Sequence, residues 1–469
     1  MNASDPFKKY AEQVCEQIRW KKAHDIVAQE IKNHLIDQKN AYMDMGDSES
    51  TAEEKALLQM GDPVAVGAAL DGTHKPAAQW GMMGLVMVLF LIGAIIQFLF
   101  LDHMLMDTDF QGVGMNSLII FLPVSLAVFF MAYFLDFSFF GKHPFLLPGM
   151  VLAIDILALF FGVQSVGRNW LMIGGFAISP ISISALFPFT FCGLLYPLRK
   201  KGIRGYFIGG IIAVVFCLQL LLWHTAGGLI LFLFSAGILM VFAASRNWFG
   251  QNAKHILVFF VIAALLMGCV LLFAVPEYTY RLSRLVSALH PEADPHGAGY
   301  LPNLLQTMLE NAVILGHGAP VPGIPMENEL FLINFRSDYL LTHLTYQYGW
   351  AVSAGLVLLL AVFLMLGFRK CLKQKSILGQ MTSLSILSTF AGEILIYVIT
   401  NLGYPLIAPI SLPFLSYGTT GLILHMFLAG ILLSTFRTGE VYRDNRKPVV
   451  SESKFIQWDD GKLIISLKG

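Results

Sequence analysis

The sequence predicts an all-α polytopic membrane protein, and its composition, its long apolar segments and the placement of its charges each support this fold class. Of the 469 residues, 56% are hydrophobic and 13% are charged, whereas a soluble domain is about 45–50% apolar and about 25% charged. Mean hydropathy is +0.66. The 31 basic and 31 acidic side chains give no net charge, so no bulk field attracts a polyanion. These values exclude a soluble enzyme, a disordered chain and a nucleic-acid-binding protein.

Residues 1–76 are predicted to form a small helical cytoplasmic domain, which we interpret as a regulatory or docking appendage. They contain no apolar stretch long enough to cross a bilayer, and they lack the short apolar region and cleavage site of a signal peptide. Their nine basic and thirteen acidic residues give a net charge of −4. Asp5-Pro6 and Asp62-Pro63 each offer an N-cap followed by proline at the first helical position. Ser50-Thr51-Ala52-Glu53 fits a capping box with Ser50 as the cap.

From Gly81 onward, long apolar runs alternate with short polar breaks. A helix needs about 20 residues to cross the hydrocarbon core of a bilayer. The segment 180–198 is the weakest candidate because it is short and contains Pro188. The transmembrane region 77–437 then holds about ten candidate spans: 82–101, 117–136, 146–164, 180–198, 206–223, 226–244, 256–275, 348–368, 379–400 and 418–436.

The distribution of Lys and Arg across the short loops predicts that both ends of the chain face the cytoplasm, because basic residues concentrate in cytoplasmic loops. With a cytoplasmic N-terminus, the basic loops 199–205 and 369–375 and the basic segment after the last span all fall inside. The loops 102–116 and 401–417, on the opposite side, carry no Lys or Arg. The topology is therefore N-in and C-in.

This topology places one long segment, 276–347, on the external face between the seventh and eighth spans. A loop of this length inside a compact protein is uncommon and is usually functional. We expect helical pieces at Pro276–Leu289 and Leu301–Leu315, followed by a Gly/Pro-rich break at 316–325. The cytoplasmic tail 438–469 alternates around Asp460-Gly461 as a small β-hairpin does.

Two external segments concentrate polar side chains near the membrane surface. One is residues 166–176, and the other is the large loop, where Asp338 lies ten residues before the eighth span. A carboxylate at the rim of an apolar cavity has a raised pKa, as a general base requires, and arginines there can hold a phosphate or pyrophosphate by forked hydrogen bonds. The alternative is that these are ordinary solvated loop charges. The charged residues of the large loop that are candidates for these roles are Arg281, Arg284, Glu310, Glu327, Glu329, Arg336 and Asp338.

Other candidates carry less specific signals. The segment His290–His296 has the composition of a metal site, but its two prolines and high polarity suit an exposed turn better. Glu393 lies inside the ninth span, where an ionisable group either packs as a hydrogen-bonded residue or serves a cavity. His224 and His425 fit satisfied core residues better than metal ligands.

Several common functional motifs are missing from the sequence. It has no GxxxxGK[ST] phosphate loop, no HExxH and no GxSxG, which removes the usual signatures of ATP-driven transport and of zinc or serine hydrolases. A proton-coupled transporter stays open, and so does the involvement of a divalent cation such as Mg²⁺ or Mn²⁺.

The strongest sequence signal is the run Ile410–Thr420, which reads ISLPFLSYGTT. It resembles the signature that precedes the last helix of the SEDS family, the FtsW/RodA/SpoVE proteins of bacterial shape, elongation, division and sporulation. Three further features lie in matching order along 82–436. They are Gly167-Arg168-Asn169-Trp170-Leu171, then Gln306 with Gly316-His317-Gly318, and then Asp338 with Gly349 eleven residues later.

The resemblance implies a peptidoglycan glycosyltransferase that polymerises lipid II at the outer face of the bacterial cytoplasmic membrane. Asp338 is then the general base toward the acceptor hydroxyl, and Arg168 and Arg336 stabilise the pyrophosphate leaving group. Trp170 lines the lipid or sugar groove. Gln306, Ser416 and Tyr417 complete the implied substrate-binding set because they match the family's motifs. The implied partners are lipid II, membrane lipids and a class B penicillin-binding protein, with no nucleic acid.

The chain departs from the family pattern at four polar positions. Asn169 replaces an arginine, Ser179-Pro180-Ile181-Ser182 lacks the family's glutamate, Trp223–Gly228 replaces a Pro-Asp-x-Gly motif, and Tyr346-Gln347 replaces a Glu-Glu pair. Two alternatives therefore stay open beside the transferase. One is a flippase for a lipid-linked cell-wall precursor, and the other is a catalytically inactive scaffold that recruits cell-wall enzymes.

Overall fold

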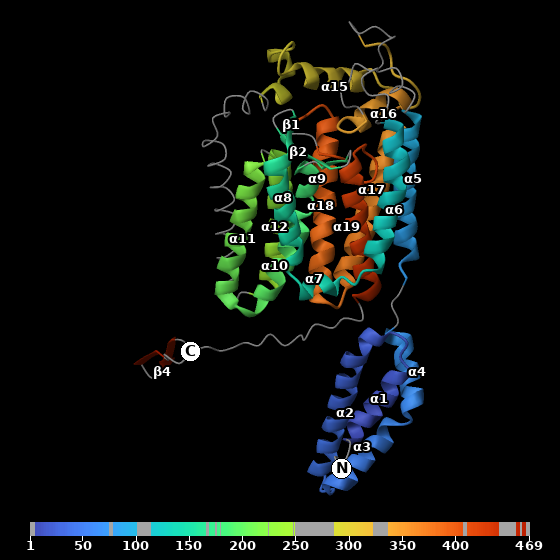
Figure 1. The fold of residues 1–469 in the computed structure, drawn as a ribbon, viewed down its shortest axis with the longest axis vertical. Coiled ribbons are helices and arrows are strands. Elements are labelled where there is room, and N and C mark those ends of the chain that lie inside the picture. Colours follow the sequence, from blue (N-terminus) through green and yellow to red (C-terminus); the bar gives the residue numbers. More distant parts are fainter. Residues whose placement is uncertain are drawn as a thin grey trace.

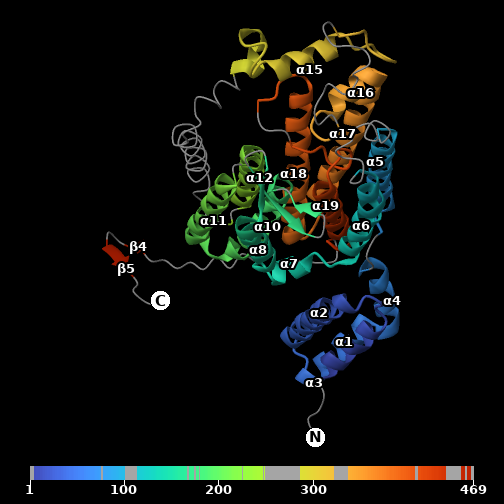
Figure 2. The same cartoon turned by 45° about the horizontal axis from the view of Figure 1, so that its top comes forward.

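The computed structural model is almost entirely helical, with two small antiparallel sheets. Figures 1 and 2 show α18 and α19 running through the middle of the main bundle, with α11 and α12 on one side and α5 and α6 on the other. The first four helices lie beyond one end of this bundle, and α15 and α16 cover the opposite end. The structure describes residues 5–74, 78–100, 114–165, 168–173, 176–178, 180–223, 225–246, 248, 286–321, 336–406, 410–439, 456–459 and 462–465.

The N-terminal helices are α1 (Pro6–Glu16), α2 (His24–Asp44), α3 (Glu49–Met60) and α4 (Pro63–His74), with a 3₁₀ turn at Lys21–Ala23. Their buried apolar side chains form a core of their own, centred on Val14, Leu35 and Ala56. This packing supports the proposed domain division near residue 76.

Side-chain caps and several ion pairs fix these four helices. The Asp5 carboxylate accepts the Phe7 N–H, as expected of an N-cap. The predicted capping box was wrong in register, because α3 begins at Glu49 and its cap is Ser48, with an extended backbone that places its hydroxyl at the Thr51 N–H. Helix α4 is tied to α1 by Asp71, which accepts two hydrogen bonds of 2.9 and 2.6 Å from the Arg19 side chain.

Six helices of the described chain are long and apolar enough to cross a membrane: α5 (Trp80–Leu99), α11 (Gly202–Leu222), α12 (Ala226–Ser245), α17 (Trp350–Lys373), α18 (Ile377–Asn401) and α19 (Thr419–Thr438). Helices α6 (Gly114–Phe134) and α8 (Leu146–Phe161) occupy two further predicted spans. The predicted span 256–275 lies outside the described residues. The number of ten spans and the N-in, C-in orientation stay predictions.

The segment 180–198 is not one continuous helix. It contains α9 (Pro180–Ser184), α10 (Phe187–Leu195) and the first residues of a 3₁₀ helix, Tyr196–Lys200. Pro188 stands in the first turn of α10, where its missing N–H has no intrahelical partner to lose. The proline therefore stands at the start of a new helix, whereas the sequence predicts one span that Pro188 interrupts. The short helix α7 (Ser138–Lys142) connects α6 to α8.

The all-α fold class is confirmed, and a three-stranded antiparallel sheet that the sequence analysis did not predict follows α8. It consists of β1 (Val163–Ser165), β2 (Arg168–Ile173) and β3 (Phe176–Ile178), with β2 in the centre. The two-residue breaks contain Gly167 and Gly174-Gly175, which is the composition of tight hairpin connections. In the C-terminal tail, β4 (Ile456–Asp459) pairs antiparallel with β5 (Lys462–Ile465), where the sequence predicts a hairpin.

On the side opposite the N-terminal helices, the described part of the large loop holds a 3₁₀ turn at Pro291–Ala293, α15 (Tyr300–Glu310) and α16 (Leu340–Tyr348). Helix α15 ends five residues before the predicted Leu315. Of the other predicted piece, only 286–289 is described, and it is helical.

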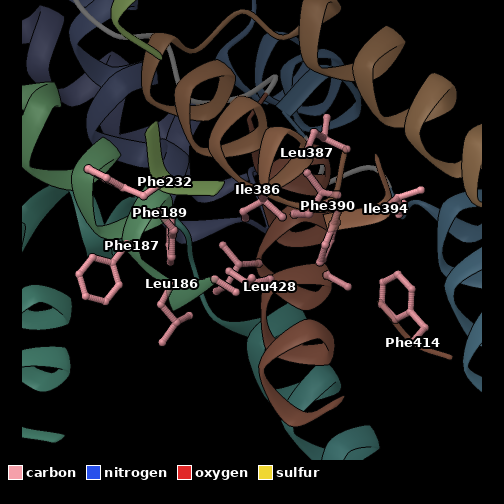
Figure 3. Packing of buried hydrophobic residues seen from close by; sticks show 14 of the residues in the cluster. Leu186, Phe187, Phe189, Phe232, Ile386, Leu387, Phe390, Ile394, Phe414 and Leu428 are labelled. Atoms are coloured by element: carbon pink, nitrogen blue, oxygen red, sulfur yellow. The ribbon is translucent and has the colours of Figure 1, made fainter. Parts of the chain in front are cut away.

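Aromatic rings fill the centre of the main bundle (Figure 3). Phe187 and Phe232 meet edge to face with ring centroids 6.3 Å apart, and Phe390 contacts Phe414 at 5.4 Å. Phe414 belongs to the ISLPFLSYGTT run, so the signature segment is part of the core packing. Helices α18 and α19 thereby connect the centre of the bundle to the end covered by α15 and α16.

Candidate functional site

Asp338 lies in the turn that leads into α16, and its residue is half-buried. The backbone of this turn is hydrogen-bonded to the C-terminal end of α18. The Asn401 Nδ2 donates to the Asp338 carbonyl at 3.0 Å, and the Tyr397 hydroxyl donates to the Ser337 carbonyl at 2.9 Å. The structure thus holds the segment that carries the predicted base against a buried membrane helix.

Arg336, two residues before Asp338, is buried with 4% of its surface exposed. Its Nε donates to the Gln97 Oε1 at 3.1 Å and its Nη2 donates to the Gln97 carbonyl at 3.0 Å, so the residue is anchored on α5. The guanidinium lies over the Tyr417 ring at 4.7 Å, a cation–π contact. Its Nη1 has no hydrogen-bond partner among the described residues.

Burial lowers the pKa of Arg336 from its ordinary value, and the neighbouring Tyr417 partly opposes that shift. An arginine stays protonated at neutral pH even when it is buried. The site therefore contains a desolvated cation with one donor nitrogen that no described residue accepts from.

The signature segment forms a strained turn directly beneath this arginine. Phe414 has φ 67°, and it is the sole non-glycine residue with positive φ in the described chain; such strain persists where the surroundings fix it. Gly93 of α5 allows the close approach, because a Cβ there would collide with the Phe414 carbonyl. The Ser416 hydroxyl accepts the Leu412 N–H at 2.8 Å and closes the turn.

Tyr417 and Gln97 connect this turn to the Asp338 segment. The Tyr417 N–H donates to the Arg336 carbonyl at 2.9 Å, and the Gln97 Nε2 donates to the Leu415 carbonyl at 2.9 Å. Beside the turn is a small cavity of about 20 Å³ between α5, α6 and α19. Its lining is largely apolar, with polar groups from Gln97, Ser416, Tyr417 and Thr419.

The other predicted site residues are placed as follows. The Gln306 Nε2 donates to the Gly403 carbonyl at 3.2 Å, so this residue ties α15 to the turn after α18. Arg168 and Trp170 pair with Ser165 and Val163 in the β1–β2 register, and their side chains lie outside the described part of the structure.

The Gly316-His317-Gly318 stretch pairs with the end of α16. The Gly316 N–H donates to the Tyr348 carbonyl at 3.1 Å, and the Gly318 N–H donates to the Tyr346 carbonyl at 2.8 Å. Gly349 has φ 97°, and a Cβ there would lie 2.5 Å from the Ile314 carbonyl. Backbone packing therefore requires the glycines of this region. They lie apart in the chain from Arg336.

Glu393 and His425 form a buried pair between α18 and α19. The His425 Nε2 lies 3.3 and 3.2 Å from the two carboxylate oxygens, and each residue is 2% exposed. Phe390 packs edge to face on the imidazole. This geometry fits the interpretation of Glu393 and of His425 as hydrogen-bonded side chains of the core.

The remaining metal candidate is an exposed turn. His290 and Glu292 are 3.5 Å apart with about 70% of each side chain exposed, and the Asp294 carboxylate accepts the Ala298 N–H. Within the described ranges, no group of three His, Cys, Asp or Glu side chains is arranged to hold a metal ion. His224 lies outside those ranges.

Sequence reasoning missed Gln97, Tyr397 and Asn401, which hydrogen-bond to the Asp338 segment. A usable signal existed for Gln97, because it is the sole polar side chain in Met82–Leu99. A polar group inside an apolar span needs a partner. No local pattern identifies that partner as Arg336, which is 239 residues away.

Comparison with known proteins adds to this geometry. The family model for cell cycle proteins of the FtsW/RodA/SpoVE type matches residues 77–439. This chain is a member of that family. It is a multi-pass bacterial membrane protein, and the predicted SEDS resemblance is confirmed.

Relatives within the FtsW/RodA/SpoVE family share about a quarter of their residues with this chain. The stage V sporulation protein E of Bacillus subtilis strain 168 is 26% identical over 292 residues, which is 60% of this chain and 75% of that protein. A probable peptidoglycan glycosyltransferase FtsW from Trichlorobacter lovleyi is 24% identical over 62% of this chain and 74% of its own length.

Solved structures share the fold. One comes from a peptidoglycan synthase complex that coordinates polymerization and crosslinking; it has a TM-score of 0.59 and 21% identity, and covers 78% of this chain and 99% of its own. The rod shape determining protein RodA of Thermus thermophilus matches with a TM-score of 0.52 and 18% identity over the same shares.

Proposed function

We propose that this protein is a peptidoglycan glycosyltransferase that polymerises lipid II at the outer face of the bacterial cytoplasmic membrane, with Asp338 as its general base. The observation that supports it most is the attachment of the Asp338 segment to the family signature through Arg336, Gln97 and Tyr417. The segment attached in this way carries both the Asp338 carboxylate and the buried Arg336 guanidinium, two residues apart in the chain. Several relatives carry the name of probable peptidoglycan glycosyltransferases.

In the proposed reaction, the Asp338 carboxylate takes the proton of the acceptor's GlcNAc 4-hydroxyl. The hydroxyl oxygen then forms a bond to the anomeric carbon of the donor, and the bond from that carbon to undecaprenyl pyrophosphate breaks. A base in position contributes about 10²–10⁴ to the rate of such a step. The pyrophosphate leaves with the electron pair, so the site must stabilise developing negative charge.

Arg336 suits that second task. Its Nη1, which has no hydrogen-bond partner in the described part of the chain, is proposed to bind a phosphate oxygen, while Gln97 holds the other side of the guanidinium. A cation that is fixed in advance and shielded from water stabilises charge better than a solvated one. Arg168 and Trp170 of β2 remain proposed contributors to the same groove. Gln306 is proposed to act by fixing α15, since its amide is bonded to Gly403.

The proposed protein partner is a class B penicillin-binding protein, which crosslinks the new strand. The support is the likeness to a chain of a peptidoglycan synthase complex that couples polymerization to crosslinking. We propose that membrane lipids contact the apolar side chains that the long helices expose, such as Leu358 and Leu372 of α17.

The test is polymerisation of fluorescent lipid II by the purified full-length protein, alone and with a candidate penicillin-binding protein. We expect Asp338→Asn to reduce glycan formation by about 100-fold or more, because the amide cannot accept the proton. Glu310→Gln is the matched control, since it makes the same change on an exposed carboxylate of the same loop, and it should leave glycan formation unchanged.

Two outcomes would overturn the proposal. Glycan ladders of equal length from the wild type and Asp338→Asn would show that Asp338 is not the general base. Failure of the wild type to form glycan, combined with lipid II translocation in proteoliposomes that Asp338→Asn retains, would establish the flippase alternative. If neither activity is found and the cellular role survives Asp338→Ala but not deletion of residues 1–76, the protein is a scaffold.

A further inference from the structure

The C-terminal end of α18 carries two buried polar residues, Tyr397 and Asn401, spaced one helical turn apart. Their exposed fractions are 1% and 3%. Residues four apart on a helix share one face, and the Asn401 Nδ2 also donates to the Tyr397 carbonyl at 3.0 Å. Both side chains reach from this face to the segment that contains Asp338.

Tyr397 and Asn401 cap α16 from a different helix. The first N–H groups of an α-helix have no partner within the helix, and α16 has no side-chain cap from its own N-cap residue. The Tyr397 hydroxyl accepts the Leu340 N–H at 2.9 Å. The Asn401 Oδ1 accepts the Thr342 N–H at 3.0 Å.

The same two side chains also hold the residues just before the helix. The Tyr397 hydroxyl, a donor as well as an acceptor, donates to the Ser337 carbonyl, and the Asn401 Nδ2 donates to the Asp338 carbonyl. The backbone is therefore fixed on both sides of the Asp338 side chain, by four hydrogen bonds of 2.9–3.0 Å. The Thr342 hydroxyl adds a fifth bond, to the Asn401 carbonyl at 2.7 Å.

We propose that Tyr397 and Asn401 are positioning residues that aim the Asp338 carboxylate at the acceptor hydroxyl. The inference rests on the proposed function of Asp338 as a base. Each acts by fixing the backbone from which the base projects. Displacement of a reacting group by about 1 Å reduces the rate by about 100-fold, so loss of this fixation lowers turnover and leaves lipid II binding intact.

The test combines kinetics with amide hydrogen exchange of the full-length protein in lipid nanodiscs. Tyr397→Phe removes one hydroxyl and leaves the ring in place. We expect it to reduce kcat by about 10- to 100-fold, to change KM for lipid II by less than about twofold, and to speed exchange of the Leu340 amide.

Tyr346→Phe is the matched control. The Tyr346 hydroxyl also donates to a backbone carbonyl, that of Ala319 at 3.0 Å, and Tyr346 lies eight residues after Asp338 in the chain. This variant should leave the Leu340 amide protected and kcat unchanged. Asn401→Asp is the second positioning variant. It keeps the acceptor for the Thr342 N–H but turns the donor toward Asp338 into a second acceptor, so kcat should fall while Thr342 exchange stays slow.

The outcomes separate this inference from the proposed function. Unchanged kcat in both Tyr397→Phe and Asn401→Asp, in a wild type that polymerises lipid II, would refute positioning and leave the base intact. Equal Leu340 exchange in wild type and Tyr397→Phe would refute the cap itself. A wild type without polymerase activity would refute the role of Asp338 as a base, and the positioning role of Tyr397 and Asn401 with it. This holds even if faster Leu340 exchange in Tyr397→Phe shows that the Tyr397 hydroxyl caps α16.

Discussion

Helices α17 and α18 are neighbours of similar length, and each could cross a membrane by length and composition, yet they differ in burial. In the apolar window of α17, 28% of residues are buried, against 67% in α18. Helix α17 exposes Leu358 and Leu372, at 65% and 73%. Helix α18 buries a series of polar residues: Thr382, Ser383, Ser385, Ser388, Thr389, Glu393 and Asn401.

This difference shows how a bilayer reverses the usual relation between apolarity and burial. Lipid tails are as apolar as leucine, so leucine gains little by packing inside the protein, and helices associate through close packing and hydrogen bonds instead. The hydroxyls of α18 satisfy themselves on the helix backbone; Ser385 bonds to Thr382 and Ser388 to Ser385. The more polar helix is therefore central, and it carries the residues that hold the Asp338 segment.

The largest expected effect on this comparison comes from breaking the buried pair between α18 and α19. His425→Leu leaves the Glu393 carboxylate buried without its partner, and we expect a loss of about 3–5 kcal/mol of unfolding free energy. Denaturation of the protein in detergent micelles measures it. The double variant Glu393→Leu with His425→Leu should recover most of the loss, because an apolar pair needs no desolvated charge. A single variant as stable as wild type would contradict the pairing.

A smaller effect is expected from filling a glycine on the buried helix. At Gly392 of α18 a Cβ would lie 2.7 Å from the Leu231 Cδ1 of α12, so Gly392→Leu should cost about 1–3 kcal/mol by overpacking. At Gly355 of α17 a Cβ would meet no atom within 4 Å. Gly355→Leu should leave the unfolding midpoint unchanged or raise it, since glycine is a poor helix former. Equal losses at both positions would mean that α17 is covered as fully as α18.

The smallest effect is expected at the exposed face of α17. Leu358→Ala should change the unfolding free energy by no more than about 0.5 kcal/mol. The Leu358 side chain is exposed on the folded protein and faces apolar surroundings in the folded and the unfolded state alike. Leu360, on the same helix, is fully buried, and Leu360→Ala should cost about 2–5 kcal/mol. The pair is compared by the same denaturation measurement. A large loss at Leu358 would indicate a protein contact on that face.

Much of the fold followed from local sequence properties. Apolar length gave the helices α5, α11, α12, α17, α18 and α19 within a few residues, because a span is defined by its own residues. The signature run and Asp338 were also found locally, as a short motif and a spacing. The sheet β1–β3 was missed, since short strands depend on context beyond their own residues. Pro188 did mark the segment 180–198 as interrupted, and this segment contains α9 and α10.

The sequence by itself determined that this is a membrane protein of the FtsW/RodA/SpoVE type with Asp338 as its candidate base. Only the tertiary structure decided what holds that residue. Gln97 meets Arg336 across 239 residues, Asn401 meets Asp338 across 63, and His425 meets Glu393 across 32. Each contact joins polar groups buried in different segments, and such groups select partners by the geometry of packing, which no local pattern encodes.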